Sequence, residues 1–137
     1  MTKEEIKAML ERYKFENQFY KEKVKEFENL QDNANKTIQI LKEIKQEQTN
    51  IKLDNIISSY AKDIVEAQDK LSTLKDRLKK TEKLLEWATQ PNMIVLYYKY
   101  INGLSIEQIA DVMNYSTQRI YQFHDNGINE IVEKEDA

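Results

Sequence analysis

Two long stretches of this chain place an apolar residue at alternating intervals of four and three positions. The first runs from Ile6 to Phe27 with one polar member, Asn17, and the second runs from Leu53 to Leu85. This spacing aligns apolar side chains along one side of an α-helix and is typical of helices that pair side by side. The chain contains only two Gly and one Pro in 137 residues, which favours long helices over sheet. The predicted fold class is therefore all-α.

The two apolar seams predict a long antiparallel, coiled-coil arm over residues 1–89. Its helices are expected at about 3–30 and 51–88, because "QDNANK" interrupts the first seam and "KQEQTN" resembles a loop, with a short helix or loop between. Thr2 followed by Glu5 is a capping-box pattern that begins the first helix. A packed core is the plain interpretation of both seams, and a groove for a cofactor or lipid is the alternative; no cofactor is expected.

A single pair of helices leaves much of each apolar stripe uncovered, so we expect the arm to associate with further copies as a homo-oligomer. The predicted oligomer seam consists of Leu53, Ile57, Tyr60, Ile64, Leu71, Leu74 and Leu78.

The net charge of the chain is only −3, so total charge does not indicate nucleic-acid binding. One stretch of the arm, Lys75 to Lys83, nevertheless holds five basic and two acidic residues. A solvated helix face is the default explanation, and contact with phosphates is the alternative. The phosphate candidates in this stretch are Lys75, Lys79, Lys80 and Lys83.

Other function classes find little support in the residues. The chain has no cysteine, so disulfides and thiolate metal sites are excluded. The longest apolar run, "MIVLYY", is too short to cross a bilayer, and no membrane partner is expected. No Gly-rich phosphate loop or activated nucleophile is present, so we do not expect an enzyme.

Residues 90–137 break the heptad pattern and predict a mini-domain of three helices. Pro91 suits the first turn of the helix "PNMIVLYYKYIN", with Thr89 or Gln90 as its cap. Gly103 can adopt the left-handed conformation that ends this helix.

Two further helices separated by "NYS" predict a helix-turn-helix. Ser105 with Gln108 forms a capping box for a helix over 106–113, and Asn114 tolerates a left-handed conformation. Ser116 can cap a third helix over 117–133. Ala110 falls where the two helices cross most closely. The apolar residues expected to be buried between the helices are Ile109, Met113, Tyr115, Ile120 and Phe123.

The segment "LSIEQIADVMNYSTQRIYQFHDNGINEI" resembles the promoter-reading helix-turn-helix of the fourth conserved region of bacterial primary sigma factors. The longer segment "YYKYINGLSIEQIADVMNYSTQRIYQFH" is still more similar to the phage ArpU and RinA late-transcription regulators. Lys99 replaces an Arg of that pattern and Gln108 replaces a Glu, while Ile120 matches conservatively. The residues that match are Tyr100, Ile101, Gly103, Leu104, Ser105, Ile109, Ala110, Tyr115, Ser116, Arg119, Tyr121 and His124.

The resemblance implies a DNA-binding regulator of transcription, an activator of late or packaging genes of a phage or prophage, working in the cytoplasm of a bacterial host. Double-stranded DNA is then the expected partner, with RNA polymerase as a further candidate.

The third helix of such a motif enters the major groove with its N-terminal turns facing the base edges. The residues that point outward there, and are the base-reading candidates, are Thr117, Gln118, Tyr121 and Gln122. Ser116 is a phosphate candidate at the helix N-terminus. Arg119 either reaches a phosphate or pairs with Glu107 or Asp111. His124 has no companion ligand for a metal and is expected to form a hydrogen bond at the rim of the mini-domain.

The charge of the mini-domain argues against DNA binding. From Pro91 onward it has three basic and seven acidic residues. Phosphate neutralisation supplies much of the affinity of a DNA-binding module, which is usually basic. The alternative function is a protein-interaction module that binds RNA polymerase, a repressor or a host-defence protein.

Overall fold

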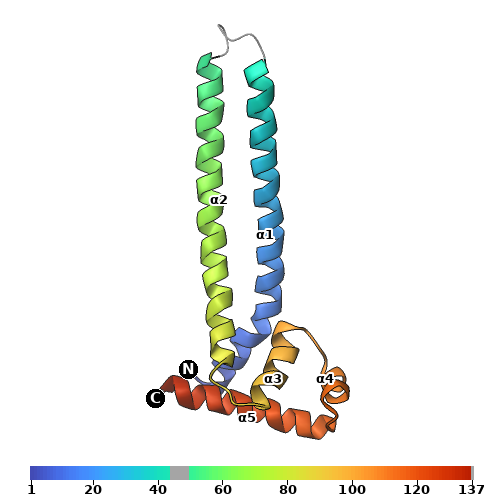
Figure 1. Cartoon of the computed structure of the whole chain (residues 1–137). Coiled ribbons are helices and arrows are strands. Elements are labelled where there is room, and N and C mark those ends of the chain that lie inside the picture. Colours follow the sequence, from blue (N-terminus) through green and yellow to red (C-terminus); the bar gives the residue numbers. More distant parts are fainter. Residues whose placement is uncertain (44–49, 137) are drawn as a thin grey trace. The chain divides into compact units, whose positions relative to one another are not determined.

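The computed structural model describes residues 1–43 and 50–136, with side chains from residue 54 onward in the second range. Every regular element of these residues is a helix, which confirms the predicted all-α class. Figure 1 labels the α-helices. Their order is α1 (Lys3–Glu43), α2 (Asn50–Leu85), α3 (Asn92–Leu96), the π-helix η1 (Tyr97–Ile101), α4 (Ile106–Met113) and α5 (Thr117–Asp136).

The chain divides into two units, and the division cuts across both long helices. The multi-helix unit contains Met1–Gln18 and Asp76–Ala137, and the two-helix unit contains Phe19–Lys75. This differs from the predicted boundary between residues 89 and 90. The reason is packing: the first turns of α1 and the last turns of α2 bury their apolar faces against the C-terminal helices.

Helix α1 is longer than predicted and is not interrupted by "QDNANK". Asp32, Asn33 and Asn35 all lie exposed on the helix, whereas Ala34 faces inward and is 2% exposed. Polar residues on the solvent side of a helix leave its backbone hydrogen bonds intact, so the expected break at residue 30 was wrong. The predicted "KQEQTN" loop falls largely on residues 44–49, which lie outside the described residues.

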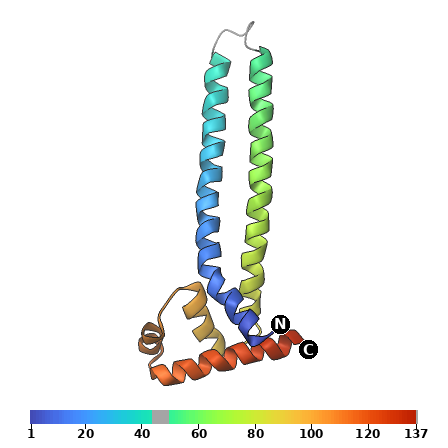
Figure 2. The ribbon, with the colours of Figure 1, turned by 180° about the vertical axis from the view of Figure 1, so that it is seen from behind.

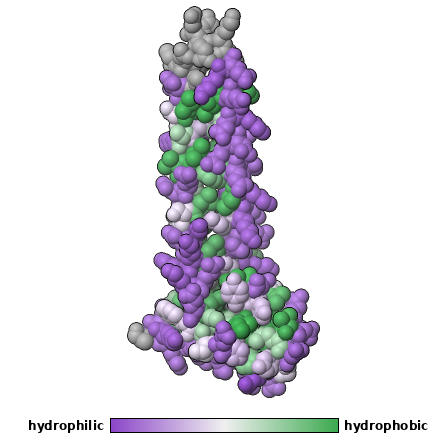
Figure 3. Space-filling model, in the orientation of Figure 1, coloured by the Kyte–Doolittle hydropathy of each residue, from purple (hydrophilic) through white to green (hydrophobic). Residues whose placement is uncertain are grey.

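In the two-helix unit, α1 and α2 lie side by side and antiparallel (Figure 2). The hydroxyls of Thr37 and Tyr60 are 3.3 Å apart across the pair. Ala34 is the one buried side chain among those described in this unit. Figure 3 accordingly shows apolar side chains reaching the surface between hydrophilic flanks. The interface is therefore a narrow strip and not a closed core.

The predicted oligomer seam divides between the two units. Five of its members lie half-buried on α2 in the two-helix unit. Of these, Tyr60 contacts Thr37 of α1, and Leu71 lines a pocket together with Phe27 of α1. Leu78 is buried in the multi-helix unit at 6% exposure. The side chain of Leu53 lies outside the described residues. The half-buried members are Ile57, Tyr60, Ile64, Leu71 and Leu74.

The core of the multi-helix unit joins residues from both ends of the sequence. One apolar cluster packs Ile6 and Leu10 of α1 with Leu85 of α2 and with Ile128 and Ile131 of α5. A second cluster joins α3, α4 and α5, and its buried members are Val95, Ile106, Ile109, Ala110, Ile120 and Phe123. Each helix therefore buries an apolar stripe on two or more neighbours.

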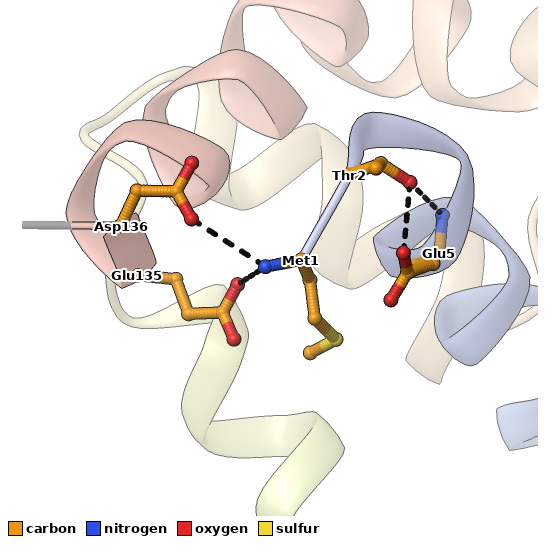
Figure 4. Close-up of polar contacts among 5 residues, drawn as sticks. All are labelled: Met1, Thr2, Glu5, Glu135 and Asp136. Atoms are coloured by element: carbon orange, nitrogen blue, oxygen red, sulfur yellow. Dashed lines mark hydrogen bonds and ion pairs between the residues drawn. The ribbon is translucent and has the colours of Figure 1, made fainter.

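Near the two chain ends, polar contacts accompany this packing (Figure 4). The Met1 amine lies 2.8 Å from a carboxylate oxygen of Glu135 and 3.4 Å from one of Asp136. The Glu5 amide donates to the Thr2 hydroxyl at 3.2 Å, as the capping-box pattern predicts. The Glu5 carboxylate accepts from the same hydroxyl and not from the Thr2 amide, so only half of the box is formed.

The helix that follows Pro91 differs from the predicted one. It consists of α3 and then the five-residue π-helix η1. Pro91 is its N-cap, without a side-chain cap, so the expected cap by Thr89 or Gln90 was wrong. Thr89 instead donates its hydroxyl to Glu130 of α5 at 2.7 Å, which ties the turn before α3 to the last helix.

The two glycines have different tasks. Gly103 follows η1 with φ +72°, a left-handed conformation, and confirms the predicted helix stop. Gly127 lies inside α5, where an added Cβ would approach Leu96 Cδ1 to 2.8 Å and Asn92 Cβ to 3.2 Å. It permits the close approach of α5 to α3, a role that the helical pattern of the sequence did not reveal.

Candidate nucleic-acid interface

Helices α4 and α5 are joined by the turn that the sequence predicts. The Gln108 amide donates to Ser105 Oγ at 3.2 Å, and the Ser105 amide donates to Gln108 Oε1 at 2.9 Å, which completes the capping box. Helix α4 ends at Met113, and Asn114 follows in the left-handed region with φ 59° and ψ 40°. These local contacts set the direction in which α5 begins.

Ser116 caps α5. Its Oγ accepts a hydrogen bond from the Arg119 amide at 3.1 Å, while its hydroxyl proton stays available to a ligand. Ser116 and Thr117 are exposed. The first turn of α5 therefore presents backbone N–H groups and two hydroxyls to solvent, an arrangement that suits an anion.

One face of the first two turns of α5 is free of protein contacts that would bury it. Ile120 is 0% exposed and Phe123 is 6% exposed, so both point toward α4 and α3. The opposite face is exposed and carries all four base-reading candidates, namely Thr117, Gln118, Tyr121 and Gln122. The structure thus brings the predicted residues together on one surface.

Arg119 is held by its own helix. Its guanidinium donates to Gln122 Oε1 at 2.9 Å and lies 4.7 Å from the centre of the Phe123 ring. It forms no ion pair with Glu107 or Asp111, so that predicted alternative was wrong. The spacing of three residues from Arg119 to Gln122 favours the intrahelical contact. Gln122 is consequently engaged as an acceptor, although its amide can still donate.

Tyr115 is less buried than predicted. It is 45% exposed, and its ring meets the Phe123 ring edge-on at a centroid distance of 5.1 Å. The left-handed Asn114 turns the chain outward, so Tyr115 covers the edge of the core instead of entering it. Ala110 is buried as expected, and Met113 is half-buried.

His124 is buried and does not lie at the rim of the fold. It is 4% exposed, its Nε2 lies 2.6 Å from the Tyr100 hydroxyl, and its Nδ1 lies 3.0 Å from Asp125 Oδ1. Burial lowers the pKa of His124, and this outweighs the opposing effect of Asp125. A neutral ring that donates from Nδ1 and accepts from Tyr100 satisfies every partner. Tyr100 and His124 are 24 residues apart, so no local pattern indicated the pair.

Two of the basic candidates between Lys75 and Lys83, namely Lys80 and Lys83, lie near the other end of α5. Lys80 and Lys83 line a pocket with Met1, whose amine contacts Glu135 at the far end of α5. At 1.5 Å per residue, Glu135 lies about 20 Å along the axis from Tyr121. Phosphate contact by these lysines stays a prediction, at a place separate from the exposed face of α5. Lys75 belongs to the two-helix unit, and Lys79 is exposed on α2.

No protein-family model, curated protein or solved structure matches the chain. Among the described residues, no helix combines the length and apolar character needed to cross a membrane. Among the same residues, no three His, Cys, Asp or Glu side chains are grouped as a metal site requires.

Proposed function

We propose that the protein is a DNA-binding regulator of transcription that inserts the N-terminal turns of α5 into the major groove. The observation that carries the proposal is the division of α5 into two faces. Ile120 and Phe123 hold the helix on its neighbours, and the opposite face is exposed and polar. Reading a groove requires a helix that packs on its domain along one face and is polar along the exposed, opposite face.

The exposed side chains have the chemistry of base readers. The Gln118 amide can donate and accept at once, which matches the N6 and N7 edge of adenine. The Thr117 methyl suits a thymine methyl, and the Tyr121 ring, 53% exposed, offers both an apolar face and a hydroxyl. Ser116 and the first amides of α5 then contact a phosphate and set the register.

The charge of the chain predicts weak dependence on salt. Arg119 is the one basic residue on α4 and α5 near the exposed face, whereas Glu107 and Asp111 are exposed on α4. Each neutralised phosphate adds about 0.9 to the slope of log affinity against log salt. We therefore expect a slope of about −1 to −3 per bound chain, well below that of strongly basic DNA-binding proteins.

The resemblance to phage late-transcription regulators supports the finer proposal that the target is a promoter of late or packaging genes, with activation through RNA polymerase. It also supports a bacterial host cytoplasm as the place of action. Both statements rest on the residues that match and on the exposed face of α5.

Selection from a random duplex library with the full chain tests the proposal. We expect an enriched sequence, to which Gln118→Ala and Tyr121→Ala each bind with about 1–3 kcal/mol less affinity at unchanged helix content. Asn129→Ala is the matched control, because Asn129 is exposed further along the same helix. Absence of any enriched sequence at low salt rejects DNA reading.

A protein-interaction module is the second candidate, and three exposed apolar or aromatic side chains favour it. Val112 on α4 is 58% exposed, the rings of Tyr115 and Tyr121 are 45% and 53% exposed, and the segment from Pro91 onward is acidic. In that case no duplex is enriched, and Val112→Ser together with Tyr121→Ala abolishes capture of a partner from host extract while Asn129→Ala does not.

A further inference from the structure

The multi-helix unit carries a second surface, at the other end of α5 from the proposed DNA contact. It is built from one face of α1 and one face of α2. On α2, Arg77, Lys80 and Leu84 share a face because they lie three and four positions apart. On α1, Met9 and Arg12 do the same, and Trp87 lies just after the end of α2. Both helices bring cations and apolar side chains to the same two neighbouring pockets.

The first pocket has almost wholly apolar walls. It has a volume of about 240 Å³ between Met9 on α1, Leu84 on α2 and Trp87 just after α2, and Met1 also lines it. Lys80 and Lys83 lie at its edge. Trp87 is 37% exposed, so an indole ring stays open to solvent in a chain that has no other tryptophan. A pocket of this size and polarity fits one or two apolar side chains.

The second pocket adjoins the first, since Met9 and Lys80 line both. Its other charged walls are Arg12, Arg77 and the single carboxylate of Glu16. None of Arg12, Arg77, Lys80 and Lys83 forms an ion pair within the described part of the chain. Two cations without an ion-paired carboxylate, Lys80 and Lys83, thus line the apolar pocket, and Arg12 and Arg77 lie in the pocket that adjoins it, in a chain whose net charge is −3.

We propose that this surface docks an acidic, amphipathic segment of another protein. One or two apolar side chains of that segment enter the pocket beside Trp87, and its carboxylates pair with Arg12, Arg77, Lys80 and Lys83. Methionine and tryptophan are favourable linings for such an anchor, because Met adapts its shape and Trp supplies a large contact area. The surrounding cations give orientation and a faster encounter.

A protein segment fits this surface better than a nucleic acid does. The walls of the first pocket offer scarcely any polar group, so the hydrogen-bonding edge of a base would be left without partners there. A leucine or phenylalanine side chain has no such requirement. The proposal does not depend on DNA binding by α5, because it uses other residues.

The test uses the full chain and a random sixteen-residue peptide library displayed on phage. Bound phage are selected on the wild type after depletion on Lys80→Glu. We expect enriched peptides that combine Asp or Glu with Leu, Phe or Trp. A synthetic copy should bind the wild type about tenfold more tightly than Lys80→Glu or Lys83→Glu, as for lost interfacial charge pairs. Trp87→Ala should weaken it by a similar factor.

Lys79→Glu is the matched control. It changes the same charge one position away, but Lys79 lies on another face of α2, three positions before Glu82, and lines neither pocket. Its affinity for the peptide should equal that of the wild type. Circular dichroism at equal concentration shows whether each variant keeps its helices. We expect the three lysine variants to keep them, because Lys79, Lys80 and Lys83 are exposed. They test the proposal even if Trp87→Ala fails to fold.

Several outcomes overturn the proposal. Enriched peptides without acidic residues, or peptides that bind Lys80→Glu as well as the wild type, exclude the surface as their site. If Lys79→Glu weakens peptide binding as much as Lys80→Glu does, general charge attraction explains the binding and no docking site is needed. Tighter binding of a sixteen-nucleotide oligo-dT than of the selected peptide points to a nucleic acid. Self-association that Lys80→Glu abolishes, with no peptide enriched, identifies the occupant as a second copy.

Discussion

The same heptad spacing leads to different burial in the two units of this chain. In the two-helix unit, Ile57, Ile64 and Leu71 are only half-buried on their seam. In the multi-helix unit, Ile6 and Leu10 continue the same kind of seam and are 0% and 1% exposed. The difference lies in the number of neighbours, because two helices cover one side of a stripe whereas α5 and α2 together close over α1. Periodicity therefore predicts which residues face inward and says little about how completely they are covered.

The largest effect should come from removing side-chain volume in the multi-helix unit. Ile131→Ala is expected to lower the free energy of unfolding by about 2–5 kcal/mol, since Ile131 is 0% exposed. Ile64→Ala is the matched change in the two-helix unit and should cost about 1 kcal/mol, in proportion to its partial burial. Urea denaturation followed by circular dichroism measures both. Equal losses would show that the two seams are buried alike in solution, which an oligomer would produce.

A smaller loss should follow from adding one carbon atom where α5 meets α3. Gly127→Ala is expected to destabilise the multi-helix unit by about 1–3 kcal/mol, because the new Cβ would lie 2.8 Å from Leu96 Cδ1. The control is Asn126→Ala at the exposed neighbouring position, where alanine should be neutral or slightly favourable. Fluorescence of Trp87 during urea denaturation reports the multi-helix unit. A stabilised Gly127→Ala would mean that α5 and α3 separate easily.

Acid should weaken the multi-helix unit through His124. Burial holds the pKa of His124 below its ordinary value, so the unfolded chain binds its proton first as the pH falls. Stability contributed by the neutral ring is therefore present above about pH 6.5 and lost as the pH drops below it, by no more than about 1.4 kcal/mol per pH unit. Urea midpoints of Trp87 fluorescence between pH 7.5 and 5.5 measure the slope.

His124→Gln is the control for this dependence, because the chain has one histidine only. The variant should be less stable than the wild type at pH 7.5, but its urea midpoint should no longer fall between pH 7.5 and 5.5. Glu130 titrates in a separate, more acidic window: burial raises its pKa, but hydrogen bonds from Asn92 and Thr89 outweigh burial and lower it. An unchanged slope in His124→Gln would assign the acid sensitivity to a carboxylate instead.

The smallest effect is expected at exposed apolar residues of the two-helix unit. Val65 is 55% exposed, so Val65→Ser should change the unfolding free energy by less than about 0.5 kcal/mol if the chain is a monomer. If this face pairs with another copy, the same change weakens the assembly, and sedimentation at two protein concentrations detects it. Ser72→Thr, at an exposed polar site of the same helix, should leave both quantities unchanged.

Local chemistry made much of this fold predictable. Three predicted features depend only on residues within four positions of one another, and the structure contains all of them. They are the capping box at Ser105 and Gln108, the left-handed conformation of Asn114 and the cap at Ser116. The exposed face of α5 followed from helical spacing alone. Contacts between distant residues were not predictable in this way, because spacing does not say which stripe meets which. The shared cluster of Ile6 and Ile131, the pair of Tyr100 and His124, and the approach of Gly127 to Leu96 belong to this second kind.

The joining of both sequence ends in one core also bears on how the protein is made. Ile6 and Leu10 leave the ribosome some 120 residues before Ile128 and Ile131 of the same cluster. At a synthesis rate of about 5–20 residues per second, these side chains wait roughly 6–24 seconds for the helix that covers them. Until α5 emerges, only α2, Ala88, α3 and η1 supply other members of this cluster. We therefore expect chaperones to bind the emerging chain at the first turns of α1.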